Sequence, residues 1–326
     1  MKEFMLFNPT SLEEAVELLG SDSSRAQLLA GGMDLLGRLK KRIDSPERLI
    51  NLKSIPGLAD IRDSQEGLSV GALVKLTELA EDSTVNTKYR ALAQAAESVG
   101  SVQIRNAGTV GGNLCQRPRC WYYRHPDFLC LQKGGTICYA QGGENRYHAI
   151  LGGGPCFFAH PSDLAPAFIV LDAQARLVGP KGQRSVAVED LYRLPIIQLN
   201  GGLGLEAGEI LAEVRVPAPK ADCRSTYVKF KEKPSFDFSL AGVAASVVVE
   251  GGKVSAARLA LSGVSPVPWR PVEAEKILTG SPLDDAAARK VADAIVEESV
   301  PLLHNRYKIP LTRAIIRRAL LSLAWT

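Results

Sequence analysis

The sequence lacks the features that would place the protein in a membrane, on nucleic acid or in an oxidising compartment. No window holds 18 uninterrupted apolar residues, so no transmembrane helix is predicted. The formal net charge is only +4, which does not indicate a nucleic-acid surface, and we interpret the longest basic run, residues 38–42, as a solvated helix face. Glu3 and helix-cap residues stand where a signal peptide would need an apolar core. We therefore expect no export signal and a reducing, cytoplasmic location.

Histidine is scarce, and the familiar motifs for nucleotide binding and nucleophilic catalysis are missing. The four histidines are His125, His148, His160 and His304, and none belongs to a Ser or Cys nucleophile motif. We interpret each of them as a hydrogen-bonded structural residue. Neither G-x-G-x-x-G nor the Walker A pattern is present, so neither a Rossmann nor a P-loop assignment is supported. The sequence thus predicts no catalytic side chain.

What the sequence does contain is an alternation of strand and helix patterns that is typical of an α+β protein. Ser11 and Glu14 form a capping box, which predicts a helix that ends at Gly20. Residues 26–32 predict a short buried strand, and residues 68–99 predict a strand followed by two helices.

The second half of the chain continues the same mixture. We predict a helix over 160–173, hairpins that turn at 179–182 and 251–252, and three helices in the last third. Prolines interrupt the pattern near 215–225, which indicates a domain boundary. Because 326 residues exceed what one hydrophobic core usually takes, two or three domains are expected.

Two glycine pairs follow apolar stretches, in LAGGMDLL (29–36) and TVGGNL (109–114). Glycine lets backbone N–H groups approach a ligand, and successive amides form a nest that binds anions. A pyrophosphate would suit two such loops. The alternative is that both pairs are tight turns with no ligand.

Cysteine occurs six times, and four of these residues lie within positions 113–138, in a segment with little periodicity that we interpret as an irregular insertion. Disulfide partners, ligands of a metal or cluster, and buried unligated thiols are the three options. A reducing compartment weakens the first option. No C-x2-C pair is present, and such pairs are the more usual pattern for a four-cysteine zinc site.

Four motifs together carry a resemblance to a known family: LAGGMDLL, AGTVGGNLCQ, HPSDLAPAFIVLDA and FDFSLAGVAASV. In this order they resemble the FAD-binding subunits of the molybdenum hydroxylases, which include the medium subunits of carbon monoxide dehydrogenase, xanthine dehydrogenases and aldehyde oxidoreductases. The resemblance implies an α+β chain with an FAD-binding fold of the vanillyl-alcohol-oxidase (PCMH) type in residues 1–216. Its two subdomains would cover about 1–58 and 59–216, and a C-terminal α+β flavoprotein domain would cover 220–326.

The resemblance also implies which residues contact FAD. Asp163 and Lys229 fall where the family contacts the cofactor, although Asp163 could instead be a helix N-cap and Lys229 an exposed strand position. Met33 stands where the family usually has Thr, so a hydroxyl contact would be lost. The full expected set is Leu29, Ala30, Gly31, Gly32, Met33, Asp34, Leu35, Leu36, Val99, Thr109, Val110, Gly111, Gly112, Asn113, Asp163 and Lys229.

Within the family, the sequence most resembles the subset with a cysteine-rich insertion, here at about 115–156. This subset includes the β subunit of 4-hydroxybenzoyl-CoA reductase and the FAD subunit of a bacterial aldehyde oxidoreductase. The resemblance implies a 4Fe–4S cluster held by Cys120, Cys130, Cys138 and Cys156. Tyr147 stands where the reductase has a ligand, and Cys130 would supply the missing thiolate. Cys115 and Cys223 are expected to be structural.

The function implied is electron transfer within a larger complex. A molybdopterin-binding large subunit would act on an aromatic aldehyde, an aromatic acyl-CoA or an N-heterocycle, and a 2Fe–2S small subunit would pass electrons to FAD here. A heterotrimer or a dimer of heterotrimers is expected, with an external electron donor or acceptor. A signal-bearing partner would move the complex to the periplasm. Two alternatives are a self-sufficient flavin oxidase and a zinc-stabilised scaffold without flavin.

Overall fold

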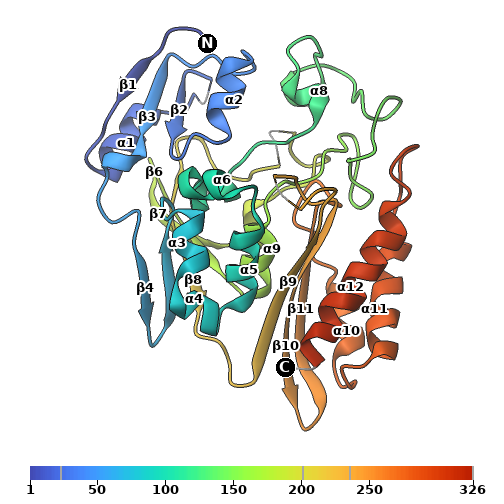
Figure 1. The fold of residues 1–326 in the computed structure, drawn as a ribbon. Coiled ribbons are helices and arrows are strands. Elements are labelled where there is room, and N and C mark those ends of the chain that lie inside the picture. The colour runs from blue at the N-terminus through green and yellow to red at the C-terminus, as the bar shows by residue number, and fades with distance from the viewer. Residues whose placement is uncertain (23, 200–201, 235, 325–326) are drawn as a thin grey trace.

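The computed structural model describes residues 1–22, 24–199, 202–234 and 236–324. Its strands form three separate sheets, and each sheet has its own helices (Figure 1). The three units follow one another along the chain, apart from the irregular insertion. This mixed helix and sheet content is the predicted α+β class.

The first unit is a small parallel sheet with two helices beside it. Its strands run in the order β1 (Met5–Phe7), β3 (Arg48–Asn51) and β2 (Ala26–Leu29). The helices are α1 (Leu12–Leu19) and α2 (Leu35–Lys40), and a 3₁₀ turn follows at Leu52–Ser54.

The predicted capping box begins α1, with one difference. Ser11 Oγ accepts from the N–H of Glu14 at 3.2 Å, whereas the Glu14 carboxylate accepts from the N–H of Thr10 rather than of Ser11. Gly20 ends the helix with φ of 60°, as the sequence indicates. The strand predicted over 26–32 stops at Leu29, because the glycine pair turns the chain away from the sheet.

The second unit is an antiparallel sheet in the order β4 (Ile61–Ser64), β5 (Gly67–Gly71), β8 (Ile210–Pro217), β6 (Gln174–Gly179) and β7 (Gly182–Ala187). The predicted turn at 179–182 joins β6 to β7. Helices pack on this sheet around the largest core, which includes Val70, Leu92 and Phe168. They are α3 (Leu76–Glu81), α4 (Ser83–Lys88), α5 (Arg90–Ser98), α6 (Val102–Ala107), α7 (Val110–Leu114) and α9 (Leu164–Val170).

The sequence predicted two helices over 68–99, and the structure has three. The extra helix, α4, begins because the Asp82 carboxylate accepts from the N–H of Val85 at 2.9 Å. The glycine-rich run that follows also contains two helices that were not predicted. Ser101 caps α6 and Thr109 caps α7, so hydroxyl caps offset the poor helix propensity of glycine.

The third unit is an antiparallel sheet in the order β11 (Lys253–Ser262), β10 (Ala241–Glu250) and β9 (Cys223–Phe230). Gly251 and Gly252 turn the predicted hairpin with φ of 57° and 78°, which only glycine adopts without strain. The predicted C-terminal helices are α10 (Val272–Leu278), α11 (Asp285–Glu297) and α12 (Lys308–Ala324). They cover one side of the sheet, and α5 and α9 contact its strands as well (Figure 1).

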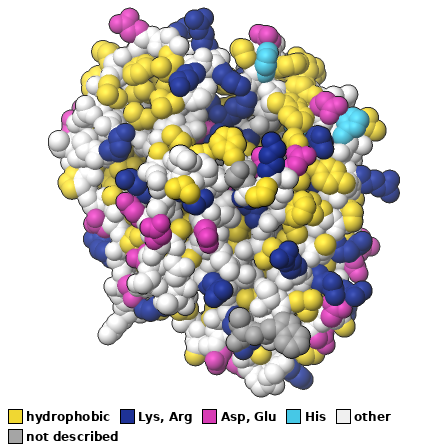
Figure 2. Space-filling model, in the orientation of Figure 1, with side chains coloured by type: hydrophobic (Ala, Val, Ile, Leu, Met, Phe, Trp, Pro, Cys, Tyr) yellow, Lys and Arg dark blue, Asp and Glu magenta, His cyan; other side chains and the backbone are white. Residues whose placement is uncertain are grey.

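The cysteine-rich insertion is irregular, as predicted, apart from α8 (Trp121–Arg124) and a 3₁₀ turn at Leu131–Lys133. It lies beside α2 and above the third sheet (Figure 1). Figure 2 shows apolar side chains gathered on this upper part of the molecule, where Leu129 and Ile137 of the insertion are more than half exposed. None of the described helices is long and apolar enough to cross a membrane.

Candidate functional site

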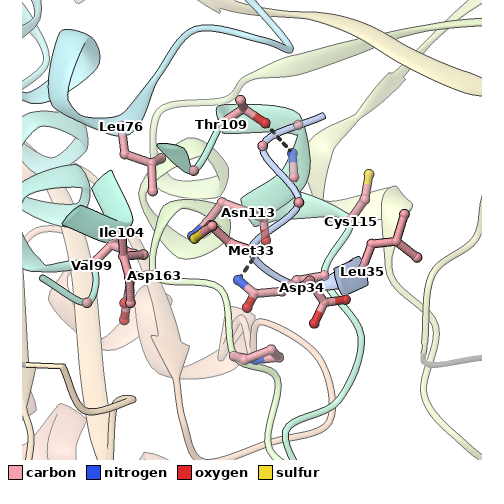
Figure 3. Close-up of a pocket in the computed structure, with 18 of the residues that line it drawn as sticks. Met33, Asp34, Leu35, Leu76, Val99, Ile104, Thr109, Asn113, Cys115 and Asp163 are labelled. Carbon is pink, nitrogen blue, oxygen red and sulfur yellow. Dashed lines mark hydrogen bonds between the residues drawn. The ribbon is translucent and has the colours of Figure 1, made fainter. Parts of the chain in front are cut away.

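A cavity of about 320 Å³ lies where the three units meet, and we call it the central cavity. The first unit contributes the loop after β2, and the second contributes α6, α7 and the start of α9. The third contributes Lys229 of β9 and the loop at 236–238. Segments distant in sequence thus form one binding-sized space (Figure 3).

Most of the residues expected to contact a cofactor line this cavity. They are Gly31, Gly32, Met33, Asp34, Leu35, Val99, Thr109, Gly111, Gly112, Asn113, Asp163 and Lys229. The other four lie behind the wall. Leu29 and Leu36 pack against the small core around Leu39, Ala30 packs against the core of the first unit, and Val110 is fully buried.

The glycine pairs bring two loops into contact that a side chain would separate. A Cβ on Gly31 would lie 2.0 Å from the carbonyl oxygen of Ala107, and one on Gly111 would lie 2.8 Å from the Cβ of Ala72. Gly32 has φ of 74°. The first pair is therefore a tight turn, whereas the second lies in the first turn of α7, and both pairs form part of the cavity wall.

The two loops differ in the backbone donors that they leave free. In the second loop, the N–H groups of Val110, Gly111, Gly112 and Asn113 already donate to Val74 O, Ala72 O, Thr109 Oγ1 and Thr109 O at 2.8–3.1 Å. In the first loop, no described residue accepts from the N–H groups of Gly31, Gly32 and Met33. The donors available to an anion therefore belong to the first loop.

Asp163 and Lys229 form a buried ion pair in the cavity wall. Lys229 Nζ lies 2.7 Å from Asp163 Oδ2 and also donates to Ser98 O at 3.1 Å, and the two side chains are 4% and 3% exposed. Burial and the charge of Asp163 raise the pKa of Tyr227, whose hydroxyl donates to Asp163 Oδ1 at 2.6 Å.

Asp163 occupies the N-cap position of α9, as one alternative held, but its side chain makes no capping bond, because Ser162 Oγ accepts from the N–H of Ala165 at 3.0 Å instead. Lys229 lies on β9, but its side chain is buried against the end of α5, so the alternative of an exposed strand position is wrong.

Four arginine residues contact the carboxylate of Asp34, and three of them were not predicted from the sequence to take part in the site. The carboxylate lies 2.5 Å from Arg124 Nη2, 3.0 Å from Arg119 Nη2 and 3.2 Å from Arg38 Nε, and it accepts from the N–H of Arg117. Burial alone would raise the pKa of Asp34, but these charges outweigh it and hold the pKa below its usual value. The interpretation of 38–42 as a solvated face is wrong for Arg38, which is buried.

Three of these arginine positions belong to the insertion, in the run RPRCWYYR (117–124). The ion pairs therefore fasten the insertion to the first glycine loop. The density of arginines in that run was the signal available in the sequence, but their partner lies more than 80 residues away. Only the fold brings them together.

Cys120, Cys130, Cys138 and Cys156 line a second, small cavity, which we call the thiol cavity. Its other walls are largely apolar or aromatic, and they include Tyr122, Tyr123, Leu131 and Phe158. All six cysteines are free thiols. Cys115 lines the central cavity instead, and Cys223 contacts Ser246 in the third sheet.

The thiols of this cavity influence one another. A hydrogen bond from Cys156 lowers the pKa of Cys138 to about 6, and the same contact together with burial raises the pKa of Cys156. Burial raises the pKa of Cys120 to about 11. Within the described part of the chain, no three His, Cys, Asp or Glu side chains are grouped closely enough to hold a single metal ion. The four thiols surround a space instead.

A third cavity of about 210 Å³, the bridging cavity, connects the other two. It shares Arg119 and Phe238 with the central cavity and Cys120 with the thiol cavity. The Arg119 guanidinium lies 5.0 Å from the centre of the Phe238 ring, and His148 Nε2 lies 3.2 Å from Cys120 Sγ. Arg119 and Cys120 are consecutive, so one peptide unit separates the walls of the two sites.

Residues 2–219 match the family described as "FAD binding domain in molybdopterin dehydrogenase", and residues 225–323 match the "CO dehydrogenase flavoprotein C-terminal domain". The chain belongs to this family of FAD-binding subunits. The predicted fold class is thereby confirmed, with an FAD-binding part followed by a C-terminal flavoprotein part.

Relatives of this FAD-binding subunit are parts of oxidoreductases. The chain is 33% identical over 299 residues to the aldehyde oxidoreductase FAD-binding subunit PaoB of Escherichia coli (strain K12), covering 90% of each chain. It is 30% identical over 322 residues to the carbon monoxide dehydrogenase medium chain of Hydrogenophaga pseudoflava, covering 97% of this chain and 95% of that one. The chain is thus an oxidoreductase subunit.

Solved structures agree over almost the whole length. A carbon monoxide dehydrogenase from Hydrogenophaga pseudoflava superimposes with a TM-score of 0.78 at 30% identity, covering 99% of this chain and 98% of that one. Quinoline 2-oxidoreductase from Pseudomonas putida 86 superimposes with a TM-score of 0.76 at 26% identity and the same coverage.

The residues of the FAD-binding subunit fit the cofactor that its family name gives. FAD is long and carries a pyrophosphate, and the central cavity offers unpaired N–H groups at the first glycine loop. The bridging cavity extends this space along the rings of Phe238 and Trp121, which suit a planar aromatic ring. The thiol cavity separately presents four cysteines, the donor set of a 4Fe–4S cluster.

Proposed function

We propose that the chain is the FAD- and 4Fe–4S-containing electron-transfer subunit of a molybdenum hydroxylase complex. It would pass electrons between the 2Fe–2S and molybdopterin subunits and an external donor or acceptor. The observation that carries the proposal is that Cys120, Cys130, Cys138 and Cys156 line one largely apolar cavity. This cavity lies near the central cavity proposed for FAD, because the consecutive residues Arg119 and Cys120 line one cavity each and both line the bridging cavity.

Of the sixteen residues listed from the resemblance, the twelve that line the central cavity would contact FAD. The N–H groups of Gly31, Gly32 and Met33 would donate to phosphate oxygens, because no described residue accepts from them. Thr109 and Asn113 line the opposite wall, while the residues behind the wall keep the loops in place. The buried pair of Asp163 and Lys229 adds a fixed dipole. When bound, FAD supplies the ability to exchange electrons singly or in pairs.

The four cysteine thiolates would hold the 4Fe–4S cluster, which exchanges single electrons. Two observations favour this group over a structural zinc ion. The sulfurs are distributed around a cavity rather than gathered into a ligand group for one ion, and no C-x2-C pair is present. A buried thiol becomes a thiolate when it binds metal, so the raised pKa of Cys120 does not prevent ligation.

The rest of the proposal concerns the complex. Relatives named as medium chains and as a subunit of a dehydrogenase complex support partners, namely a molybdopterin-binding large subunit and a 2Fe–2S small subunit in a heterotrimer or a dimer of heterotrimers. The half-exposed apolar side chains of the insertion suit a protein contact. Of the three substrate classes proposed, an aromatic aldehyde, an aromatic acyl-CoA and an N-heterocycle, the names aldehyde oxidoreductase and quinoline 2-oxidoreductase support the first and the third.

We also propose the domain division at 216–220 and a cytoplasmic location. The two family matches, which end at 219 and begin at 225, support the division. A cytoplasmic location would keep the six free thiols reduced. A signal-bearing partner would instead take the complex to the periplasm.

The experiment is anaerobic purification of the full chain, followed by absorbance spectroscopy and analysis for iron, zinc and flavin. We expect flavin bands above the broad absorbance of an iron–sulfur cluster. Cys130→Ser should lose the iron and keep FAD, because Cys130 lines only the thiol cavity. The matched control Cys223→Ser should keep both, because Cys223 lies in the third sheet.

Three outcomes would contradict parts of this proposal. A flavoprotein without iron would remove the cluster. A colourless chain that holds zinc would favour a scaffold without flavin. Reduction of the flavin in the isolated chain by a simple substrate would favour a self-sufficient oxidase.

A further inference from the structure

His148 lies against one of the proposed cluster cysteines, although we expected only a structural role for it from the sequence. Its Nε2 is 3.2 Å from Cys120 Sγ, and the residue is only 3% exposed. It also lines the bridging cavity, between Cys120 and the loop at 236–238 that borders the FAD site.

The imidazole ring is fixed in place by its surroundings. The N–H of His148 donates to Asn145 O at 2.9 Å, and Asn305 Nδ2 donates to His148 O at 3.1 Å. The rings of Trp121 and Tyr122 lie with their centres 5.6 Å and 6.3 Å from the centre of the imidazole. A ring held on both sides keeps its distance to Cys120.

The proton of the ring belongs on the nitrogen that faces the sulfur. Nε2 is the ring nitrogen that faces Cys120 Sγ. A proton on Nε2 meets a thiolate, which can only accept, whereas a proton on Nδ1 alone would leave Nε2 and the thiolate as two acceptors facing each other.

We propose that His148 donates an Nε2–H···Sγ hydrogen bond to the Cys120 thiolate and thereby raises the reduction potential of the cluster. The inference rests on the proposed 4Fe–4S site. Hydrogen bonds to the ligand sulfurs withdraw negative charge from a cluster, so its reduced form is stabilised. His148 is then a positioning and tuning residue and not a ligand.

The test compares midpoint potentials of the reconstituted full chain, measured by redox titration with EPR detection. His148→Phe and His148→Met remove the donor, and both should shift the cluster to a more negative midpoint potential. His148→Gln keeps an N–H at a similar reach and should restore most of the shift. The matched control is His125→Phe, since His125 is an exposed histidine of the same insertion that does not line the thiol cavity.

The flavin midpoint potential is recorded in each sample, and the His125→Phe chain serves as the control for both potentials, because His148 also lines the bridging cavity. Equal cluster potentials in wild type, His148→Phe and His148→Met, with iron content unchanged, would overturn the role of His148 and leave the proposed function standing. Absence of iron from the wild-type chain would remove the proposed function, and this inference would fall with it.

A second measurement needs no variant, so it holds even if the variants lose the cluster. Wild-type chain with ¹⁵N-labelled histidine is reduced and studied by electron–nuclear double resonance in H₂O and in D₂O. We expect an exchangeable proton and a histidine nitrogen coupled to the cluster spin. A loaded cluster without either coupling would overturn the hydrogen bond.

Discussion

At the scale of single residues, burial decides what a charge does in this protein. The ion pairs Lys229–Asp163 and Lys88–Asp63 have nearly equal lengths of 2.7 Å and 2.6 Å. The first is almost completely buried, while the Lys88 and Asp63 side chains are 48% and 33% exposed. The two pairs therefore make a matched test of what the buried pair contributes.

We expect Lys229→Met to destabilise the apo chain by about 3–5 kcal/mol, because it leaves the Asp163 carboxylate buried and unpaired. Lys88→Met should cost less than about 1 kcal/mol, since water can solvate Asp63. Urea unfolding of both variants measures the difference. If both variants lost the same free energy of unfolding, breaking the buried pair would cost no more than breaking the exposed pair.

Residue types and short motifs allowed much of the site to be predicted. Glycine pairs, the HPSD motif and the cysteines indicated the loops that line the cavities, because close approach and metal ligation need those residue types. The arginines around Asp34 and the contact of His148 with Cys120 were not predicted. Both join positions far apart in the chain, and neither follows from a local pattern.

At the scale of elements, the two glycine loops act as one unit. The backbone of Gly31 rests on the carbonyl of Ala107, just before α7, so the spacing of the loops is set by the absence of a side chain. Gly37, in the middle of α2, has no atom within 4 Å of where its Cβ would lie. The same substitution should thus have opposite effects at these two positions.

Gly31→Ala should separate the loops and weaken FAD binding by at least about tenfold, which corresponds to about 1.4 kcal/mol. Gly37→Ala should leave FAD affinity unchanged and stabilise the chain by up to about 1 kcal/mol, because alanine is the better helix former. Titration of apo chain with FAD, followed by flavin fluorescence, gives both affinities. An unchanged affinity in Gly31→Ala would mean that the cavity tolerates a wider spacing of the loops.

At the scale of the whole molecule, the C-terminal unit is hydrogen-bonded to the cysteine-rich insertion. Lys308 at the start of α12 is completely buried, and its Nζ donates to Tyr147 O at 3.0 Å and to Gly263 O at 2.7 Å. Asn305 donates to His148 O and Ala149 O. These hydrogen bonds link the C-terminal unit to the insertion, so conditions that unfold one of them should disturb the other.

This arrangement predicts a pH dependence of stability. Burial lowers the pKa of Lys308 from 10.5 to about 7. Between these values the unfolded chain binds a proton that the folded chain does not, so the free energy of unfolding should rise with pH through that window. The free-energy cost of burying the Lys308 cation is greatest below pH 7, where the folded chain keeps the proton, and it decreases as the pH rises towards 10.5.

Urea unfolding between pH 7 and pH 9 measures this effect. The urea concentration at the unfolding midpoint of the wild-type chain should increase over that range. Lys308→Met lacks the titrating amine at position 308, so its midpoint should depend less on pH. Parallel curves for the two chains would show that Lys308 is not the group responsible.

The sequence by itself determined the class of elements and the hairpins, because these depend on local chemistry such as caps, turns and side-chain alternation. The family resemblance of its motifs indicated twelve of the residues that line the central cavity. The two glycine loops were similar in sequence, yet the N–H groups of Val110 and Gly111 donate to distant carbonyls and those of Gly112 and Asn113 to Thr109, whereas no described residue accepts from the N–H groups of the first loop.

Only the tertiary structure decided which polar groups were available and which were occupied. Asp163 and Lys229 were each expected near the cofactor, but their buried ion pair with each other was not predicted. The cavity around Cys120, Cys130, Cys138 and Cys156 likewise forms only in the folded chain, while Cys115 lines the central cavity. Burial and partnership depend on segments that are distant along the chain, so they exist only once the chain has folded.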